Sequence, residues 1–393
     1  MADESPRPRA AGPNPSHQFR LVSPNFSVET QGLLKPLEPG PLASLALRAG
    51  RFFAALQSGP ALLVGAVPFD VTAEDCLFQP ERLGAVDGAA VPEAPAGSRW
   101  LVRPQPDAAA YADCVAQCLD LMERGQGQVD GITKAVLSRS LLLESDQPIS
   151  VARLMRRLAQ DPTVTLFRTP LPARDGLVPV MVGATPELLV SKRGDRVVSH
   201  PLAGSARRSA DPSLDRQAGR DLLNSEKDQR EHRVVTESIL DVLSPYCLEL
   251  GAPDGTTLRA TASMLHLGTR IVGRLRDAET PVAELLALLH PTPAVCGMPR
   301  PSAAAAIRRL ETYDRGFYAG AVGWIDGRQD GDWYVTIRCA KIAGRQARVF
   351  AGAGIVPGSD PQKETQETSA KFQAMLNALG IDEHGRPLQE NAA

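Results

Sequence analysis

Residues 317–356 read FYAGAVGWIDGRQDGDWYVTIRCAKIAGRQARVFAGAGIV, and residues 360–379 read DPQKETQETSAKFQAMLNAL. Aromatic and β-branched residues are concentrated in FYAGAVGWID, DWYVTIRCAKI and ARVFAGAGIV, and turns containing Gly and Asp separate them, which predicts three strands. Phe372, Leu376 and Leu379 form an apolar stripe that predicts a helix. A run of strands followed by a helix favours an α+β fold, with large antiparallel sheets packed against helices.

The rest of the chain mixes strand and helix patterns without an internal repeat. Short apolar stretches bounded by turn residues predict strands, and a 3.6-residue apolar period predicts helices. The predicted strands are KAVLSRSLLLES (134–145), GLVPVMVGA (176–184) and ELLVSKRGDRVVSHPLAG (187–204), the last with a hairpin turn at 193–195; residues 42–70 predict a helix and then a strand. The other predicted helices cover 107–125, 149–161, 225–243 and 302–314. This order does not favour regular βαβ units.

Composition suggests how the chain is organised. Residues 1–20 are rich in Pro, Ala and Arg and are predicted to form a disordered tail. Residues 21–125 are interpreted as the N-terminal part of the fold, and residues 126–382 as the core that carries the chemistry, both within one structural domain. Residues 85–98, AVDGAAVPEAPAGS, are typical of a loop.

Charge and cysteine usage exclude some classes of protein. The formal net charge is -2, so neither nucleic acid nor an acidic membrane surface is an expected partner. The six cysteines lack CxxC spacing and are expected to be reduced thiols of a cytoplasmic protein. The N-terminus lacks the apolar region of a signal peptide, and no stretch reaches the roughly 18 apolar residues of a membrane span. Nothing in the pattern requires more than a monomer.

Two predicted helices offer paired acidic residues. Glu364, Glu367 and Lys371 share one face of the last helix, and Asp228 and Glu231 lie in the helix at 225–243. Such charges usually form a solvated surface with local ion pairs. However, the Gly-rich FAGAGIV just before the last helix would allow a ligand to approach the backbone closely. If the two helices face one another, their carboxylates would suit Mg²⁺, which prefers hard oxygen ligands.

Lys134 and Glu187 are candidates for acid–base chemistry. Lys134 begins a largely apolar strand, where a lysine is usually an edge residue with its charge in water. In a closed pocket, loss of solvation would instead make it a usable general base. Glu187 lies at a junction between strands and is more often a turn residue. In a partly apolar pocket it would keep its proton and act as a general acid.

Other polar residues allow two interpretations each. Gly204 and Ser205 follow a strand and would offer a backbone N–H and a hydroxyl, and His266 is either a ligand contact or a core histidine. Arg338 lies among residues of high β propensity, so its guanidinium needs an anionic partner, either in the protein or in a substrate. The proline-rich segment 290–303 either shapes a pocket wall or connects elements.

Taken together, these segments resemble the chorismate-utilising enzymes, namely the isochorismate synthases, the salicylate synthases and the synthase components of anthranilate and aminodeoxychorismate formation. The resemblance lies, in the family's order from about residue 130 to 380, in KAVLSR, ATPELL, PLAGSARR, LLNSEKDQREH, LHLGTR, LLHPTPAVCGMP, DRGFYAGAVGW, VTIRCAK and FAGAGIVPGSDPQKETQETSAK. Each segment is weak alone, but the ordered set is specific. It implies the chorismate-utilising-enzyme fold, with the active site in a central cleft.

The resemblance also implies roles for residues. Glu231 and Glu367 match Mg²⁺ ligands, with Asp228 and Glu364 behind them through waters. Lys134 matches the base that activates water for attack at C2 of chorismate, and Glu187 matches the acid that protonates the departing C4 hydroxyl. The residues that match substrate-binding positions are Gly204, Ser205, His266, Ala294, Val295, Tyr318, Arg338, Gly352, Gly354 and Lys371.

Within the family, Lys134 separates members that use water from those that use ammonia from a glutaminase partner and lack this lysine. The resemblance therefore favours a water-using enzyme without a glutamine amidotransferase partner, most similar to isochorismate synthases of 2,3-dihydroxybenzoate and catecholate siderophore formation. A salicylate synthase, which also eliminates pyruvate, and a silent binding protein on the same fold are the alternatives. Val295 (commonly Leu) and Thr365 (commonly aromatic) depart from the pattern, and Val295 leaves some pyruvate elimination open.

Overall fold

The computed structural model describes residues 17–24, 26–84 and 98–388, in which strands form three sheets whose pairings are antiparallel. The predicted α+β class with large antiparallel sheets is confirmed. β1 begins at Gln18, so the last residues of the expected tail lie in a strand, whereas residues 1–16 and most of the expected loop (85–97) lie outside the described residues.

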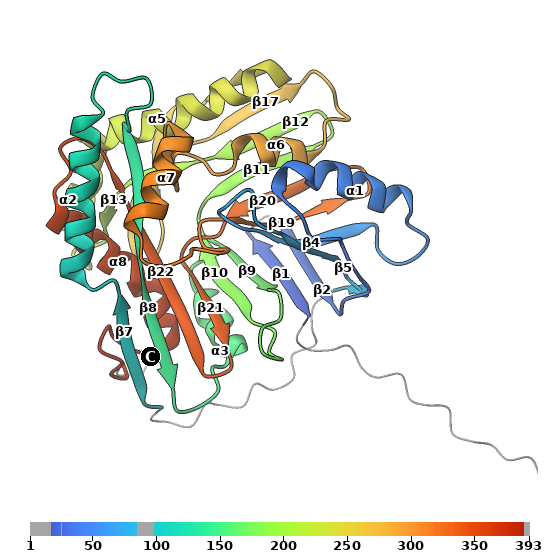
Figure 1. Cartoon of the computed structure of the whole chain (residues 1–393), viewed down its shortest axis with the longest axis horizontal. Helices are drawn as coiled ribbons and strands as arrows, with labels where there is room; N and C mark the ends of the chain where they lie inside the picture. The colour runs from blue at the N-terminus through green and yellow to red at the C-terminus, as the bar shows by residue number, and fades with distance from the viewer. Residues whose placement is uncertain (1–16, 25, 85–97, 389–393) are drawn as a thin grey trace, which may run out of the picture.

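The first sheet has the order β18-β8-β22-β21-β10-β9-β1-β2-β6, with β7 also paired to β8. Its strands are β1 (Gln18–Ser23), β2 (Phe26–Gln31), β6 (Arg82–Leu83), β7 (Trp100–Gln105), β8 (Lys134–Ser145), β9 (Thr165–Pro170), β10 (Val180–Thr185), β18 (Gly297–Met298), β21 (Cys339–Ala343) and β22 (Gln346–Ile355). Strands from before residue 125 therefore flank a continuous block of strands from after it, with β7 beside β8 on one side and β1, β2 and β6 on the other, as Figure 1 shows from β7 at the left to β2 at the right.

The second sheet has the order β14-β17-β12-β11-β20-β19-β4-β5-β3, and the third has the order β13-β16-β15. The second consists of β3 (Lys35–Pro36), β4 (Leu62–Val67), β5 (Cys76–Gln79), β11 (Leu188–Arg193), β12 (Arg196–His200), β14 (Cys247–Gly251), β17 (Ile271–Leu275), β19 (Ala321–Asp326) and β20 (Gly331–Val335). The third consists of β13 (Leu202–Arg207), β15 (Thr256–Ala260) and β16 (Met264–Thr269).

Helices cover the sheets, and side chains cap the N-termini of α5 and α8. They are α1 (Leu45–Ala54), α2 (Ala108–Arg124), α3 (Val151–Leu158), α4 (Pro212–Asn224), α5 (Glu226–Leu243), α6 (Val282–Leu289), α7 (Arg300–Leu310) and α8 (Pro361–Leu379), with 3-10 turns at Leu42–Ser44 and Ser244–Tyr246. The N-cap Ser225 accepts a hydrogen bond from the Asp228 N–H of α5, and Asp360 caps α8 in the same way.

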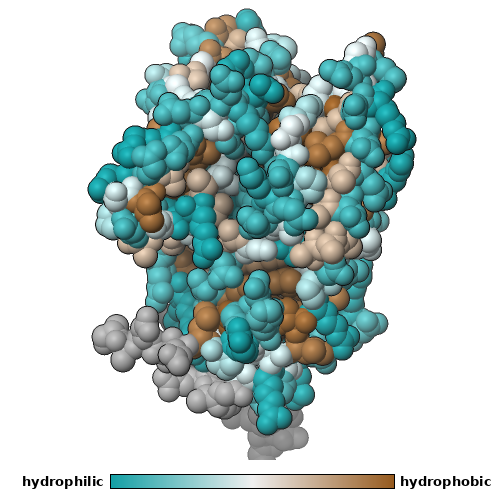
Figure 2. Space-filling model, turned by 90° about the vertical axis from the view of Figure 1, so that its left-hand side faces the viewer, coloured by the Kyte–Doolittle hydropathy of each residue, from teal (hydrophilic) through white to brown (hydrophobic). Residues whose placement is uncertain are grey.

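The two faces of the first sheet bury different neighbours. Val180 and Val182 of β10 pack with α3 and α8, whereas Met181, which points to the opposite face, belongs to the core shared with the second sheet. On the second sheet α6 packs against β11 and β20, and α5 packs against β13 and β16 of the third sheet. Seen from the side of α2 and α8, the surface is mainly hydrophilic with small apolar patches (Figure 2).

Two segments cross from one large sheet to the other, and they lie together. Residues 186–187 join β10 of the first sheet to β11 of the second, and residues 336–338 join β20 of the second to β21 of the first. The Ala184 N–H donates to the Arg338 carbonyl at 3.1 Å, and the Val335 N–H donates to the Glu187 carbonyl, also at 3.1 Å. The seam between the sheets is therefore where these side chains leave the regular strands.

The prediction of one strand over 332–342 is wrong for this reason. Arg338 has a φ of 50°, in the left-handed region that interrupts a strand, and the residues before and after it pair in different sheets. High β propensity on both sides hides this change of sheet. Two predicted boundaries also move: β19 begins at Ala321, and α7 covers Arg300–Leu310 rather than 302–314.

Candidate active site

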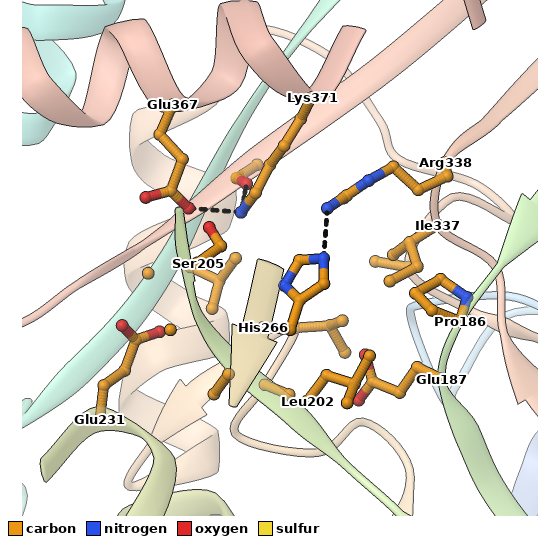
Figure 3. Close-up of a pocket in the computed structure, with 18 of the residues that line it drawn as sticks. Pro186, Glu187, Leu202, Ser205, Glu231, His266, Ile337, Arg338, Glu367 and Lys371 are labelled. Atoms are coloured by element: carbon orange, nitrogen blue, oxygen red, sulfur yellow. Dashed lines mark hydrogen bonds and ion pairs between the residues drawn. The ribbon is translucent and has the colours of Figure 1, made fainter. Parts of the chain in front are cut away.

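A pocket of about 620 Å³, including the part open to solvent, lies at the seam where the three sheets, α5 and α8 meet. It is lined by Val136, Pro186, Glu187, Leu202, Ala203, Gly204, Ser205, Glu231, His266, Ala294, Val295, Tyr318, Ala319, Ile337, Arg338, Gly352, Gly354, Glu367 and Lys371. Figure 3 shows Glu231 and Glu367 on one side of this space and Glu187, Pro186 and Arg338 on the other.

Most of the residues singled out in the sequence line this pocket. Lys134, Asp228 and Glu364 do not line it but lie directly behind its wall, next to residues that do. Lys134 is fully buried at the start of β8, and its Nζ lies 3.1 Å from Glu231 Oε1. The structure thus brings the candidate residues together in one region, while their chemical roles stay predictions.

The side of the pocket formed by Glu231 and Glu367, with Asp228 and Glu364 behind them, is its acidic end. There, three lysines each contact one carboxylate. Besides the pair of Lys134 with Glu231, Lys227 Nζ lies 2.7 Å from Glu364 Oε1. Lys371, one turn beyond Glu367 on α8, contacts that carboxylate and also donates to the Gly352 carbonyl at 2.8 Å. Asp228 and Glu364 lie in the first turns of α5 and α8, where the helix dipole favours negative charge, and Glu231 and Glu367 lie one turn further along.

Two glycines leave the space that these carboxylates occupy. A Cβ on Gly354 of β22 would lie 2.2 Å from Glu231 Oε1, far closer than van der Waals contact allows. A Cβ on Gly204, which has a φ of 71°, would lie 3.0 Å from Asp228 Cβ, at a bulge between Ala203 and Ser205. Glu231 and Asp228 can therefore lie this close to the strands that line the pocket only because Gly354 and Gly204 have no side chains.

The carboxylates differ in their affinity for protons. Burial acts to raise the pKa of Glu367, but the adjacent Lys371 ammonium, the Ser205 hydroxyl and the Lys227 charge together lower it. Burial raises the pKa of Asp228 and also that of Glu364, and the nearby Glu367 charge raises the latter further. Glu364 and Asp228 thus gain from any additional cation at this end.

These four acids fit a hard divalent cation by their chemistry and by the room that Gly354 provides. In residues 17–24, 26–84 and 98–388, no three such side chains already stand in a ligand arrangement, because lysines hold the carboxylates. Glu231 and Glu367 would have to turn from Lys134 and Lys371 to share an ion.

The opposite end of the pocket is built for a proton donor and an anion. Glu187 is 3 % exposed, and its burial raises its pKa to about 8 even though Lys134 and Arg338 act in the opposite direction. Glu187 therefore carries its proton at neutral pH. Arg338 Nη2 lies 3.4 Å from His266 Nε2, and burial together with the Arg338 charge lowers the pKa of His266 well below its usual value. Because the His266 imidazole is neutral, it does not balance the charge of the Arg338 guanidinium, which can therefore bind an anion.

Sequence reasoning missed a buried clamp behind the pocket wall. Arg315 donates to the carbonyls of Val136, at 2.6 Å, and Val295, at 2.9 Å, and forms an ion pair with Glu311. Glu311 also accepts from the N–H and hydroxyl of Ser138. The clamp fixes β8 relative to the segment that carries Val295. Only the position of Arg315 within DRGFYAGAVGW, beside Tyr318, gave a signal for it.

Comparison with known proteins identifies the family. A model described as chorismate binding enzyme matches residues 79–380. Isochorismate synthase DhbC of Bacillus subtilis is 41 % identical over 378 residues, which cover 93 % of this chain and 94 % of the relative. The chain belongs to the chorismate-binding enzymes, and within them to the isochorismate synthases.

Solved structures of isochorismate synthases have the same fold. A Bacillus anthracis protein assigned as 2,3-dihydroxybenzoate-specific isochorismate synthase DhbC is 36 % identical, with a TM-score of 0.84 over 94 % of this chain and 98 % of that one. MenF, the menaquinone-specific isochorismate synthase from Escherichia coli, is 25 % identical, with a TM-score of 0.78 over 92 % and 88 %. The expected chorismate-utilising-enzyme fold is therefore confirmed.

The two departures from the isochorismate synthase pattern lie in different places. Val295 lines the pocket. Thr365 is buried on α8 outside the lining; its hydroxyl donates to the Pro361 carbonyl at 2.8 Å, and its carbonyl accepts from Arg139 at 3.3 Å. Within the part of the chain that the structure describes, no helix has the length and apolar character needed to cross a bilayer.

Proposed function

We propose that the pocket isomerises chorismate to isochorismate by adding water at C2 while the C4 hydroxyl departs. The observation that carries the proposal is Glu187, a buried acid protonated near neutral pH, in the same pocket as a cluster of carboxylates and lysines. Hydroxide is a poor leaving group, so its departure needs a proton donor. The match to isochorismate synthases supports this substrate and reaction.

In this proposal Lys134 is the general base and Glu187 the general acid. Lys134 takes a proton from water as the water oxygen bonds to C2 and both ring double bonds shift toward C4. Glu187 gives its proton to the C4 oxygen as that C–O bond breaks, which releases water. A proton then returns from Lys134 to Glu187 through solvent, so the overall change is an isomerisation. Lys134 must be neutral to accept a proton, so Glu231 has to turn away from it during catalysis.

We assign magnesium to the acidic end. Glu231 and Glu367 would hold the ion, with Asp228 and Glu364 behind them through waters, because these are the hard oxygen donors the ion prefers. Bound there, magnesium would draw electron density toward the ring carboxylate of chorismate and make C2 more electrophilic. The requirement that Glu231 leave Lys134 is then common to ion binding and to the action of Lys134 as a base.

The remaining lining residues position the substrate. Lys371 with the backbone of Gly352 and Gly354 binds the ring carboxylate, since these groups adjoin the acidic end. Arg338 and Tyr318 bind the enolpyruvyl carboxylate, Arg338 from the opposite end and Tyr318 from beside Gly352. The ring between them contacts the side chains or backbone of Gly204, Ser205, His266, Ala294 and Val295.

We propose 2,3-dihydroxybenzoate and catecholate siderophore formation as the use of the product. DhbC-type relatives match over more than nine tenths of this chain. The menaquinone-specific Escherichia coli enzyme has a lower identity and a lower TM-score, and a Mycobacterium tuberculosis relative named MenF, although 42 % identical, matches over 84 % of this chain, so coverage favours the siderophore branch. The proposed location is the cytoplasm, and the proposed working state is a monomer that needs no glutaminase partner.

The test incubates purified protein with chorismate and Mg²⁺, with and without ammonium, and separates products by chromatography with mass detection. We expect a product of unchanged mass and different retention time, blocked by a chelator and indifferent to ammonium. Salicylate and pyruvate formed faster than isochorismate decays would instead identify a salicylate synthase, for which the smaller Val295 would be the cause. Unchanged chorismate under all conditions would contradict the proposal.

A further inference from the structure

A second cavity adjoins the candidate active site. It has a volume of about 1020 Å³, including the part open to solvent, and it shares Pro186 and Arg338 with the catalytic pocket. Its other walls come from the end of α3, the last turns of α8 and the turn between β15 and β16. Pro186 and Arg338 thus form a partition with space on both sides, and Figure 3 shows them at the end of the pocket away from Glu231 and Glu367.

The partition contains a side chain that can move. Among the described residues Arg338 makes no ion pair, and its one side-chain hydrogen bond is the 3.4 Å contact to His266. That contact is long for a hydrogen bond and is made to an imidazole that is neutral, so breaking it costs little. A guanidinium held this weakly can meet an anion on either face.

The charges favour this side of the pocket for an anionic ligand. Chorismate carries two carboxylates, and at the opposite end four acids outnumber the three lysines that contact them, so the formal charge there is net negative and disfavours its approach. The second cavity offers apolar walls such as Leu158 and Val164, and the Arg338 charge lies at its inner end. Its one carboxylate, Asp161, already accepts from the backbone N–H of Ala262 at 2.7 Å.

We propose that this second cavity is the antechamber through which the dicarboxylate substrate enters and the product leaves. Arg338 binds the leading carboxylate there and swings with it past Pro186 into the catalytic pocket. The inference rests on the proposed function, because it takes the same substrate. It adds a second, transient binding site and a route, neither of which the chemistry at Lys134 and Glu187 requires.

The test fills the antechamber from two independent elements. Ala374 of α8 and Ala262 of the turn both line it, so Ala374→Trp and Ala262→Trp are the blocking variants. Ala116→Trp, on an exposed helical face of α2, and Ala278→Trp, in an exposed turn, are the matched controls. We expect kcat/KM for chorismate to fall at least tenfold in both blocking variants and to stay within twofold in both controls.

Two further measurements separate a blocked route from a distorted site. The single-turnover rate at saturating concentrations and the Mg²⁺ affinity by calorimetry should both match the unmodified protein, because the chemistry lies beyond the partition. Wild-type kcat/KM in both blocking variants would overturn the route, and so would a loss confined to Ala374→Trp together with weaker Mg²⁺ binding. If the unmodified protein produced no isochorismate, the proposed function would be wrong, and so would the proposed antechamber.

Discussion

Each end of the pocket contains a glutamate, and the pKa values of these two residues move in opposite directions. Glu187 feels Lys134, Arg338 and Lys371 from a distance, yet burial prevails and raises its pKa to about 8. The side chain of Glu367 is 24 % exposed; burial still acts to raise its pKa, but contact with Lys371, the Ser205 hydroxyl and the Lys227 charge together lower it. Direct contact with a cation, together with a hydroxyl, therefore lowers a carboxyl pKa where more distant cations do not, and one pocket can hold an acid and an anion together.

The largest effect is expected at Lys134, which pairs with Glu231 at the acidic end and whose charge also acts on Glu187 at the other end. Lys134→Ala removes the proposed base, so turnover should fall below detection while Mg²⁺ still binds. Without metal the variant should also lose stability, by about 3–5 kcal/mol, because Glu231 is left buried without its partner. Product chromatography and denaturant unfolding, with and without Mg²⁺, measure both effects.

Lys192→Ala is the matched control for that variant. Lys192 is another buried lysine, and its Nζ lies 2.9 Å from Asp330 Oδ1, but it does not line the pocket. It should lose comparable stability and keep the turnover of its folded fraction. Normal turnover by Lys134→Ala would show that the base has been assigned wrongly.

The next largest effect is expected at the proton-donating end. Glu187→Gln keeps the shape and the neutral state of the side chain but cannot supply a proton, so kcat should fall by about 10²–10⁴. In the unmodified protein kcat should decline above pH 8, as Glu187 loses its proton. A pH–rate profile from pH 6 to 10 checks both points. A profile in which the variant keeps both the wild-type rate and this decline would contradict the role.

At the anionic end, Glu367→Gln should leave the reaction pathway intact but weaken Mg²⁺ binding at least tenfold, because it removes one hard charged ligand. Glu237→Gln, on the exposed side of α5, has the same change of charge away from the pocket and is the control. Isothermal calorimetry gives the affinities directly. Equal Mg²⁺ titrations for the two variants would remove the metal assignment.

A smaller effect is expected from crowding the acidic end. Gly354→Ala places a methyl group where Glu231 Oε1 lies, so Glu231 must shift, and we expect a loss of several-fold to tenfold in kcat/KM and Mg²⁺ affinity. Gly251→Ala changes a strand glycine that has open space around it and should be neutral. Equal behaviour of the two variants would mean that the space at Gly354 is not needed.

The two ends of the pocket differ in how far the sequence predicts them. The acidic end lies on two amphipathic helices, so residue spacing alone predicts that Glu364, Glu367 and Lys371 share one face. The other end depends on the crossings at 186–187 and 336–338, where Arg338 leaves a strand-like pattern through a left-handed residue. Hydrophobic periodicity indicates which face of a helix or strand a side chain lies on. It does not indicate where the chain passes from one sheet to another.

Elements without periodicity escaped prediction for a related reason. Helix α6 reads VAELLALL and is buried on most sides, so it lacks a polar face that would mark it as helical. The clamp of Arg315 with Glu311 joins α7 to β8 and the Val295 segment, and such a contact between distant residues has no local pattern. The same holds for the pairing of Lys134 with Glu231.

The smallest effect is a change of stability with pH that belongs to Glu187 alone. Its usual pKa is 4.5 and its pKa in the folded protein is about 8, so below pH 4.5 both the folded and unfolded states hold the proton. Between these values the unfolded chain releases it and the folded protein keeps it, so this residue's contribution to the unfolding free energy falls as pH rises, by up to about 1.4 kcal/mol per pH unit. Glu187→Gln has no such proton, so the wild type should lose stability relative to this variant from pH 5 to 8, after which the difference should level off. Denaturant unfolding at four pH values and constant Mg²⁺ measures that difference; parallel curves would mean that Glu187 is already ionised in the folded protein, and the contrast between the two ends of the pocket would disappear.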